Sequence, residues 1–329
     1  SPLGRAPLRG EHHEASATLM NRDTRIFGIV LTCFFLSGLA ALLYQTVWMR
    51  VFSIVFGTSE LAVVTVLMAY MGGLALGAAL IGRLLPRLQR PVMVYALLEL
   101  GIALSAALVP SALRAVRALH IALMGDLPEL PDAAGLGNGL FYLAAGFLIL
   151  MIPTAFMGAT LPLLAKGVVH TRAEIGRRIG LLYGINTVGA VFGTLLAAFV
   201  LMPALGMHLT ATTGVAINVF VGLLGFAVAR RLRPDEAPEN RSPAAADDSD
   251  TARRQKKAKK AGAAEESGVR WVKLVFPLMM LSGALSFAYE VMWTRLLGQV
   301  VGGSLAGFAT MLASFLTGIA LGSMIASRL

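Results

Sequence analysis

Runs of about 20 apolar residues recur along the whole chain, separated by shorter polar or charged segments. Because about 20 helical residues cross the hydrocarbon core of a bilayer, each run predicts a membrane-spanning helix. The pattern predicts eight such helices, at about 26–49, 60–84, 91–113, 139–165, 179–203, 209–230, 273–297 and 304–328. The sequence therefore predicts an all-α, polytopic membrane protein, with the lipid bilayer as its first partner.

The composition agrees with this prediction and excludes several other classes of protein. The 329 residues are 57% hydrophobic and only 14% charged, whereas about a quarter of the residues of a soluble domain are charged. The one cysteine, Cys33, lies inside the first apolar run, so no disulfide framework is expected. We find no HExxH pair, Cys/His cluster or GxSxG motif. The sequence predicts no catalytic residue, no cofactor and no metal site.

The net charge of +10 follows the expected membrane topology. With the N-terminus in the cytoplasm, 24 of the 28 Lys and Arg residues lie in segments on the cytoplasmic side. Basic residues accumulate on that side of membrane proteins. We therefore expect both termini in the cytoplasm, and a topological role for the charge rather than nucleic-acid binding.

Two polar segments divide the chain. Residues 1–25 lack an apolar run and are expected to form a disordered cytoplasmic N-terminal segment. Residues 231–270 are rich in Ala, Pro and charge, so they predict a disordered cytoplasmic linker. The linker separates a six-helix membrane unit at 26–230 from a two-helix unit at 271–329. A third segment, 111–138, predicts an external loop that contains an amphipathic interfacial helix.

The two-helix unit repeats the beginning of the six-helix unit. Residues 37–84 and 282–329 align without a gap at an offset of 245 and are identical at 16 of 48 positions, including paired Tyr, Trp and Arg residues. We expect parallel repeats in a 6 + 2 arrangement, which resembles the plan of the major facilitator superfamily. Two interpretations of the short second repeat stay open: a piece of a longer protein, or a natural eight-helix protein.

Charged residues inside predicted spans are the first candidates for a ligand site, because burying them in a bilayer is costly. Glu99 lies about eight residues, or roughly 12 Å, from the cytoplasmic end of the third span. Glu290 lies in the seventh span, and its aligned partner in the first repeat is Gln45. The alternative roles are structural: a buried acid paired with a neighbouring helix for Glu99, and an ion pair near the membrane surface for Glu290.

Aromatic residues and one amide complete the candidate site. Tyr44 and Trp48 are four residues apart and share a helix face, as do Tyr289 and Trp293. These aromatic pairs are expected either to line an external vestibule that holds an ammonium group or to belong to the aromatic belt of the membrane surface. Asn186 lies among regularly spaced glycines, where it either binds ligand or forms a hydrogen bond across helices.

The fourth and fifth spans carry a family resemblance. The segments MGATLPLLAK and GRRIGLLYGINTVGAVFGTLLAAF resemble the membrane part of bacterial proteins that fuse a major-facilitator unit to a spermidine-synthase-like domain. SGLAALLYQTVWMR and YALLELGIAL fit the same family. The resemblance implies a bacterial inner membrane and a cytosolic aminopropyltransferase-like domain after the helices, although no segment of this chain matches that domain.

Three functional hypotheses follow from these observations. The first is a transporter-like module linked to polyamine metabolism, which binds or moves a cationic amine or its precursor. The second is a non-transporting membrane scaffold for a cytosolic transferase domain or a partner subunit. The third is a membrane-bound enzyme that acts on a lipid or a modified peptide, since one fold serves many chemistries.

Overall fold

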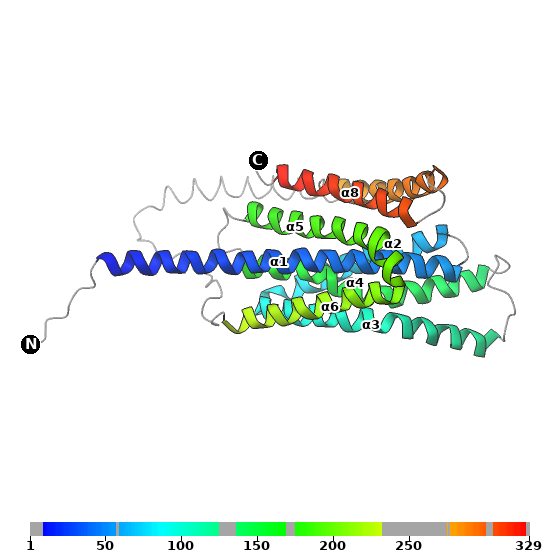
Figure 1. Ribbon diagram of the computed structural model, residues 1–329, viewed down its shortest axis with the longest axis horizontal. Helices are drawn as coiled ribbons and strands as arrows, with labels where there is room; N and C mark the ends of the chain where they lie inside the picture. Colours follow the sequence, from blue (N-terminus) through cyan, green and yellow to red (C-terminus); the bar gives the residue numbers. More distant parts are fainter. Residues whose placement is uncertain are drawn as a thin grey trace, which may run out of the picture.

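A computed structural model describes residues 9–56, 59–124, 136–168, 175–231, 275, 277–300 and 305–326. Within these residues every regular element is a helix (Figure 1). The helices are α1 (Arg9–Phe56), α2 (Ser59–Leu84), α3 (Pro91–Met124), α4 (Leu136–Val168), α5 (Ile175–Leu196), α6 (Met202–Arg231), the helix 277–300 and α8 (Leu305–Ala326). A 3₁₀ turn, η1 (Leu85–Arg87), follows α2, and a π-helical segment, η3 (Ala197–Leu201), follows α5. The predicted linker 231–270 lies outside the described residues except for Arg231.

Six helical segments of the described chain are long and apolar enough to cross a membrane. They are Arg25–Ile54, Val63–Arg87, Pro91–Leu123, Leu140–Val168, Gly176–Arg231 and Leu305–Ile325. The prediction of a multi-pass membrane protein is therefore confirmed. The helix 277–300 is not one of the six, and the predicted span at 273–297 begins outside the described residues, so this span stays a prediction.

Two helices extend further than the sequence predicted. Helix α1 begins at Arg9, inside the segment 1–25 for which composition predicted disorder. Residues 11–27 contain neither Gly nor Pro, and extending an existing helix costs far less than starting one. Helix α3 likewise runs through Pro110 to Met124. The interfacial helix expected after residue 111 is therefore the continuation of α3 rather than a separate element.

The chain reverses direction between α5 and α6, as Figure 1 shows. Near the start of α6, Gly206 has a non-helical backbone and marks a kink. The segment Gly176–Arg231 contains 56 residues, far more than the 20 that cross a bilayer once. Gly206 has φ 78° and ψ 173°, a conformation that is essentially confined to glycine. This residue divides the segment into two helices near the turn that the sequence predicted between its fifth and sixth spans.

We expect Gly206→Ala to lower the free energy of unfolding by about 1–3 kcal/mol, the usual cost of holding a side chain in such a backbone conformation. No described atom lies within 4 Å of a Cβ placed there, so the loss would come from backbone strain alone. Thermal denaturation in detergent would measure it. Gly176→Ala, at an equally open helical position without positive φ, is the control. Equal stability of the two variants would contradict a positive φ at Gly206.

Close helix contacts at glycines hold the bundle together. On α2, a Cβ at Gly77 would overlap the backbone of Ala155 on α4. On α5, Gly189 and Gly193 lie against the backbone of α1 at Phe35 and Leu39. Small residues permit such approach between membrane helices. The regularly spaced glycines of the fifth span thus form a close contact between helices, and its partner is α1.

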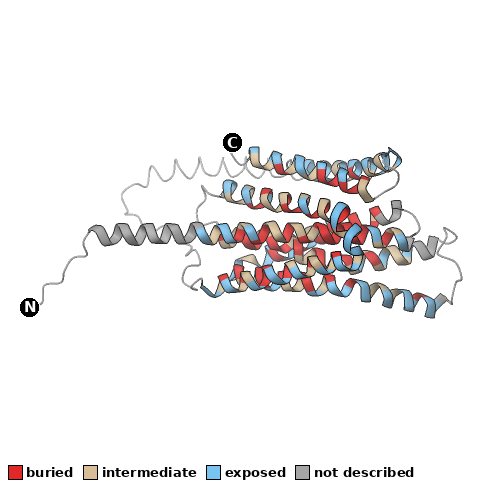
Figure 2. Ribbon diagram, in the orientation of Figure 1, coloured by how far each residue is buried: buried red, intermediate tan, exposed pale blue. Residues whose placement is uncertain are grey.

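Buried residues concentrate along α1 and on the helix faces around it, whereas the outer faces of the bundle are exposed (Figure 2). Many large apolar side chains lie on these outer faces, including Leu97, Leu104, Leu148 and Leu223, each more than half exposed. An exposed apolar surface of this extent is unusual for a soluble monomer and suits contact with lipid. The structure thus indicates a bundle with a packed centre and a lipid-facing exterior.

Candidate functional site

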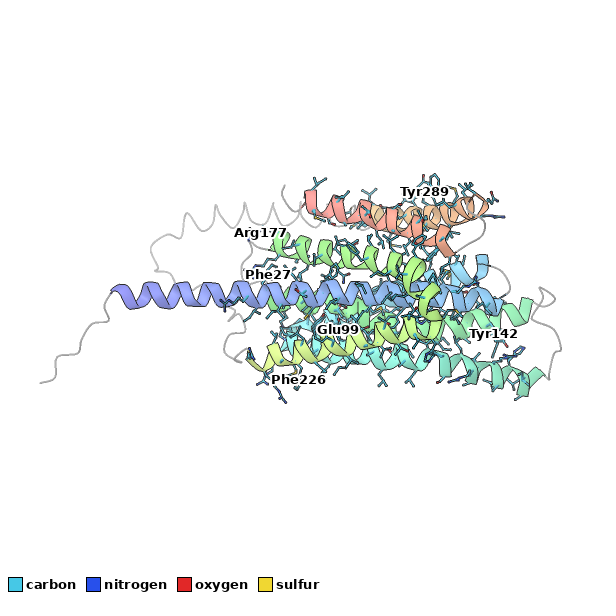
Figure 3. The ribbon with its side chains drawn as sticks, in the orientation of Figure 1. Phe27, Glu99, Tyr142, Arg177, Phe226 and Tyr289 are labelled. Atoms are coloured by element: carbon cyan, nitrogen blue, oxygen red, sulfur yellow. The ribbon has the colours of Figure 1, made fainter. Side chains whose placement is uncertain are left out.

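Glu99 lies fully buried in the middle of the bundle (Figure 3). It belongs to α3, and both of its carboxylate oxygens accept a hydrogen bond. The hydroxyl of Ser37 on α1 donates to Oε1 at 2.7 Å. The side-chain amide of Asn218 on α6 donates to Oε2 at 2.6 Å. Buried polar groups are stable only when they are paired in this way. Glu99 therefore connects three helices that are far apart in sequence.

The network continues to the aromatic residues of α1. The Tyr44 hydroxyl donates to Oδ1 of Asn218 at 2.9 Å, so this amide both donates and accepts. Trp48 stacks on Tyr44 with ring centroids 5.4 Å apart and planes 13° apart. Both aromatic side chains are buried, at 0% and 3% exposure. Tyr44 and Trp48 therefore lie in the core of the bundle.

One further hydroxyl lies near this network. Tyr95 precedes Glu99 by one helical turn, so the two side chains share a face of α3. Its hydroxyl is buried close to the carboxylate of Glu99 and the hydroxyl of Ser37. Sequence reasoning missed Ser37, Asn218 and Tyr95 as parts of this cluster. Asn218 offered the clearest signal, as a lone amide within a long apolar run.

Gln45 and Glu290, which align in the two repeats, are each buried with one unpaired polar atom. They are 2% and 3% exposed. The amide nitrogen Nε2 of Gln45 and the carboxylate oxygen Oε1 of Glu290 have no hydrogen-bond partner in the described part of the chain. Leaving a buried polar atom unpaired costs about 1–3 kcal/mol, and more when the group is charged. Glu290, unlike Glu99, thus keeps an oxygen free to accept from a ligand.

The aromatic pair of the second repeat lies in different surroundings from the first. Tyr289 and Trp293 are 54% and 51% exposed, and Figure 3 shows Tyr289 at the outer edge of the bundle. The structure therefore does not bring the four predicted aromatic residues together. One pair belongs to the core and the other to the surface.

Asn186 on α5 contacts α1. Its Nδ2 donates to the carbonyl oxygen of Phe34 at 2.9 Å, and its own backbone carbonyl lies where a Cβ of Gly38 would be. This contact is the hydrogen bond across helices that the sequence analysis offered as the alternative to ligand binding. Asn186 therefore contributes to the packing of α5 on α1.

The described residues contain no cluster of three or more His, Cys, Asp or Glu side chains able to hold a metal ion. Cys33 is a free, buried thiol on α1. The candidate residues include two buried carboxylates: Glu99 accepts a hydrogen bond at each oxygen, whereas Oε1 of Glu290 has no partner among the described residues.

The chain matches no protein-family model, no curated protein and no solved structure. The family resemblance of the fourth and fifth spans consequently rests on the sequence motifs alone.

Proposed function

We propose that this chain is a transporter-like membrane module that binds or moves a cationic amine. The observation that carries this proposal is the buried carboxylate of Glu290, whose Oε1 has no partner among the described residues. An unpaired carboxylate inside a membrane protein is costly and marks a ligand or ion pathway by default. An ammonium group, which carries one positive charge and only hydrogen-bond donors, is complementary to it.

Gln45 contributes a second, neutral contact in this proposal. Its side chain is buried and its Nε2 is unpaired. Because a 180° flip exchanges the amide oxygen and nitrogen, the same side chain is able to offer an acceptor to an amine. Glu290 would then contact a charged end of the ligand and Gln45 a neutral end, so the pair suits a ligand whose two ends differ in charge.

The polyamine class follows from the resemblance to fused major-facilitator and spermidine-synthase proteins. The gap-free repeat supports a major-facilitator-like plan of parallel units, within which movement would proceed by alternating access. The distribution of Lys and Arg supports cytoplasmic termini in a bacterial inner membrane. A fused or separate cytosolic transferase domain would be the metabolic partner.

The test uses the purified full chain in detergent, with spermidine as the probe and thermal denaturation as the readout. We expect spermidine to raise the melting temperature of the wild-type chain. Glu290→Gln should weaken the apparent affinity by about ten- to a hundredfold, because it removes one charge-assisted hydrogen bond. Without ligand, Glu290→Gln should be at least as stable as the wild type, because it removes an unpaired buried charge.

Three controls sharpen this test. Thr294 lies one turn away on the same helix, and its hydroxyl donates to the backbone carbonyl of Glu290. Thr294→Val should therefore leave the affinity for spermidine unchanged. An uncharged diol of similar length should not stabilise the chain, and NaCl at equal ionic strength should not replace spermidine. If spermidine stabilises neither protein, or stabilises Glu290→Gln equally, the amine proposal fails and the non-transporting scaffold becomes the better interpretation.

A further inference from the structure

Three glycines of the first repeat lie in tight contacts between helices. On α1, a Cβ at Gly38 would overlap the backbone carbonyl of Asn186 on α5. On α2, a Cβ at Gly73 or Gly77 would overlap Thr154 or Ala155 of α4. Thr154 reinforces the second contact by donating a hydrogen bond to the carbonyl oxygen of Ala69 at 3.1 Å. These contacts show what this glycine pattern does when its partner helices are present.

The second repeat keeps the same three glycines with nothing against them. Gly283 on the helix 277–300 aligns with Gly38, while Gly318 and Gly322 on α8 align with Gly73 and Gly77. No described atom lies within 4 Å of a Cβ built on any of the three. The same glycine pattern thus occurs in both repeats, and described helices cover it only in the first.

Polar and aromatic residues beside these glycines follow the same pattern. Ser282 aligns with Ser37 and is exposed, although Ser37 is buried against Glu99. Tyr289 and Trp293 are about half exposed, whereas their aligned residues are buried in the core. Figure 2 shows that most of the helix 277–300 is exposed. The helix 277–300 and α8 therefore each present a face that no described residue covers, whereas the aligned faces of the first repeat are covered.

Lipid alone does not account for this face. Where the described helices are exposed in both repeats, the residues are large and apolar, as at Leu76 and its aligned Leu321 or at Leu80 and its aligned Ile325. The uncovered face carries glycines, a serine and a tyrosine beside apolar residues such as Leu285 and Met292. Small and polar residues are typical of contacts between membrane helices. The repeat itself supplies the comparison, because the aligned residues of α1 and α2 contact helices rather than solvent.

We propose that the helix 277–300 and α8 dock a helical membrane segment that packs on them as α4, α5 and α6 pack on α1 and α2. One helix of this segment would lie on Gly318 and Gly322, as α4 lies on α2. A second would lie on Gly283 with its backbone in close approach, and a third would offer an acceptor to Tyr289. The proposal does not depend on amine binding.

A second copy of this chain fits this face poorly. The matching surfaces of its own α4 and α5 are already covered by its α2 and α1 at Gly77, Gly38, Gly189 and Gly193. Helix α5 also contacts α8, through Gly184 and Met324. The occupant is therefore a distinct helical segment with small residues facing the hairpin, and not a dimer partner.

Photochemical cross-linking of the full chain in its native membrane tests the proposal. In one variant, the photoreactive residue p-benzoylphenylalanine replaces Tyr289, whose side chain has a similar shape. In the control variant it replaces Leu321, which is exposed, as is its aligned residue Leu76. We expect the probe at position 289 to form an adduct with an apolar helical peptide that carries small residues at four-residue spacing. The probe at position 321 should react with lipid.

Disruption of the glycine contact makes the result specific. Gly283→Leu should reduce the position-289 adduct about tenfold, through overpacking of the contact. Gly82→Leu, the same change at another open glycine, should not. Because position 283 is open, the melting temperature of the purified chain should be unchanged by Gly283→Leu. The proposal fails if the probe at position 289 reacts only with lipid or with a second copy of the chain. It also fails if Gly283→Leu and Gly82→Leu give equal yields of the adduct.

Discussion

Glu99→Ala is expected to lower the free energy of unfolding by about 2–6 kcal/mol, because two buried hydrogen-bond donors lose their acceptor at about 1–3 kcal/mol each. The variant removes both acceptors at the centre of the network. The hydroxyl of Ser37 and the amide of Asn218 would then lose their partners in a buried site. Thermal or denaturant unfolding of the purified chain in detergent would measure the loss.

Graded variants distinguish loss of the network from loss of volume. Glu99→Gln keeps one acceptor and should lie between the wild type and Glu99→Ala. Ser105→Ala is the control on the same helix, because its hydroxyl bonds only to carbonyls of α3 and its loss should cost less than about 1 kcal/mol. In a double-mutant cycle, Ser37→Ala should couple to Glu99→Ala by about 1–2 kcal/mol. Additive effects would show that these residues do not interact.

Gly77→Ala should destabilise the bundle by about 2–3 kcal/mol, near the upper end of the range for overpacking. The added Cβ would overlap the carbonyl oxygen of Ala155, and a backbone atom of a packed helix moves aside less easily than a flexible side chain. The expected sign is opposite to that of a typical Gly→Ala change in a helix, which stabilises by about 1 kcal/mol. The melting temperature in detergent again gives the readout.

Two matched glycines test whether the α2–α4 contact causes this loss. Gly82→Ala lies on the same helix in open space and should be neutral or slightly stabilising. Gly322→Ala changes the aligned residue of α8, which also meets no described atom, and should likewise be tolerated in the purified chain. If Gly77→Ala is as stable as these two, the close approach of α2 and α4 does not occur.

The sequence located the candidate carboxylates but did not separate their roles. Glu99 and Glu290 were both predicted from the cost of placing charge in a membrane. In the structure, Glu99 has a hydrogen-bond donor at each oxygen, whereas Glu290 keeps one oxygen unpaired. The difference depends on Ser37 and Asn218, which lie 62 and 119 residues from Glu99 in the chain. No local pattern reports such distant pairing.

The aromatic residues show a second limit of local reasoning. Tyr44 and Tyr289 have similar sequence surroundings, so a repeat-based prediction assigns them the same role. Tyr44 is fully buried and bonded to Asn218, whereas Tyr289 is 54% exposed. Their burial differs because helix α6 covers one and no described helix covers the other.

The sequence by itself determined that this protein is a bundle of apolar helices, that its first two helices recur near the other end of the chain, and that small residues line its helix contacts. These properties follow from periodicity and length, which act within one helix at a time. Only the tertiary structure decided which acid is paired, which aromatic pair is buried and which glycine face is open. Those outcomes depend on which distant helices meet, and the spacing of residues within each helix does not specify that choice.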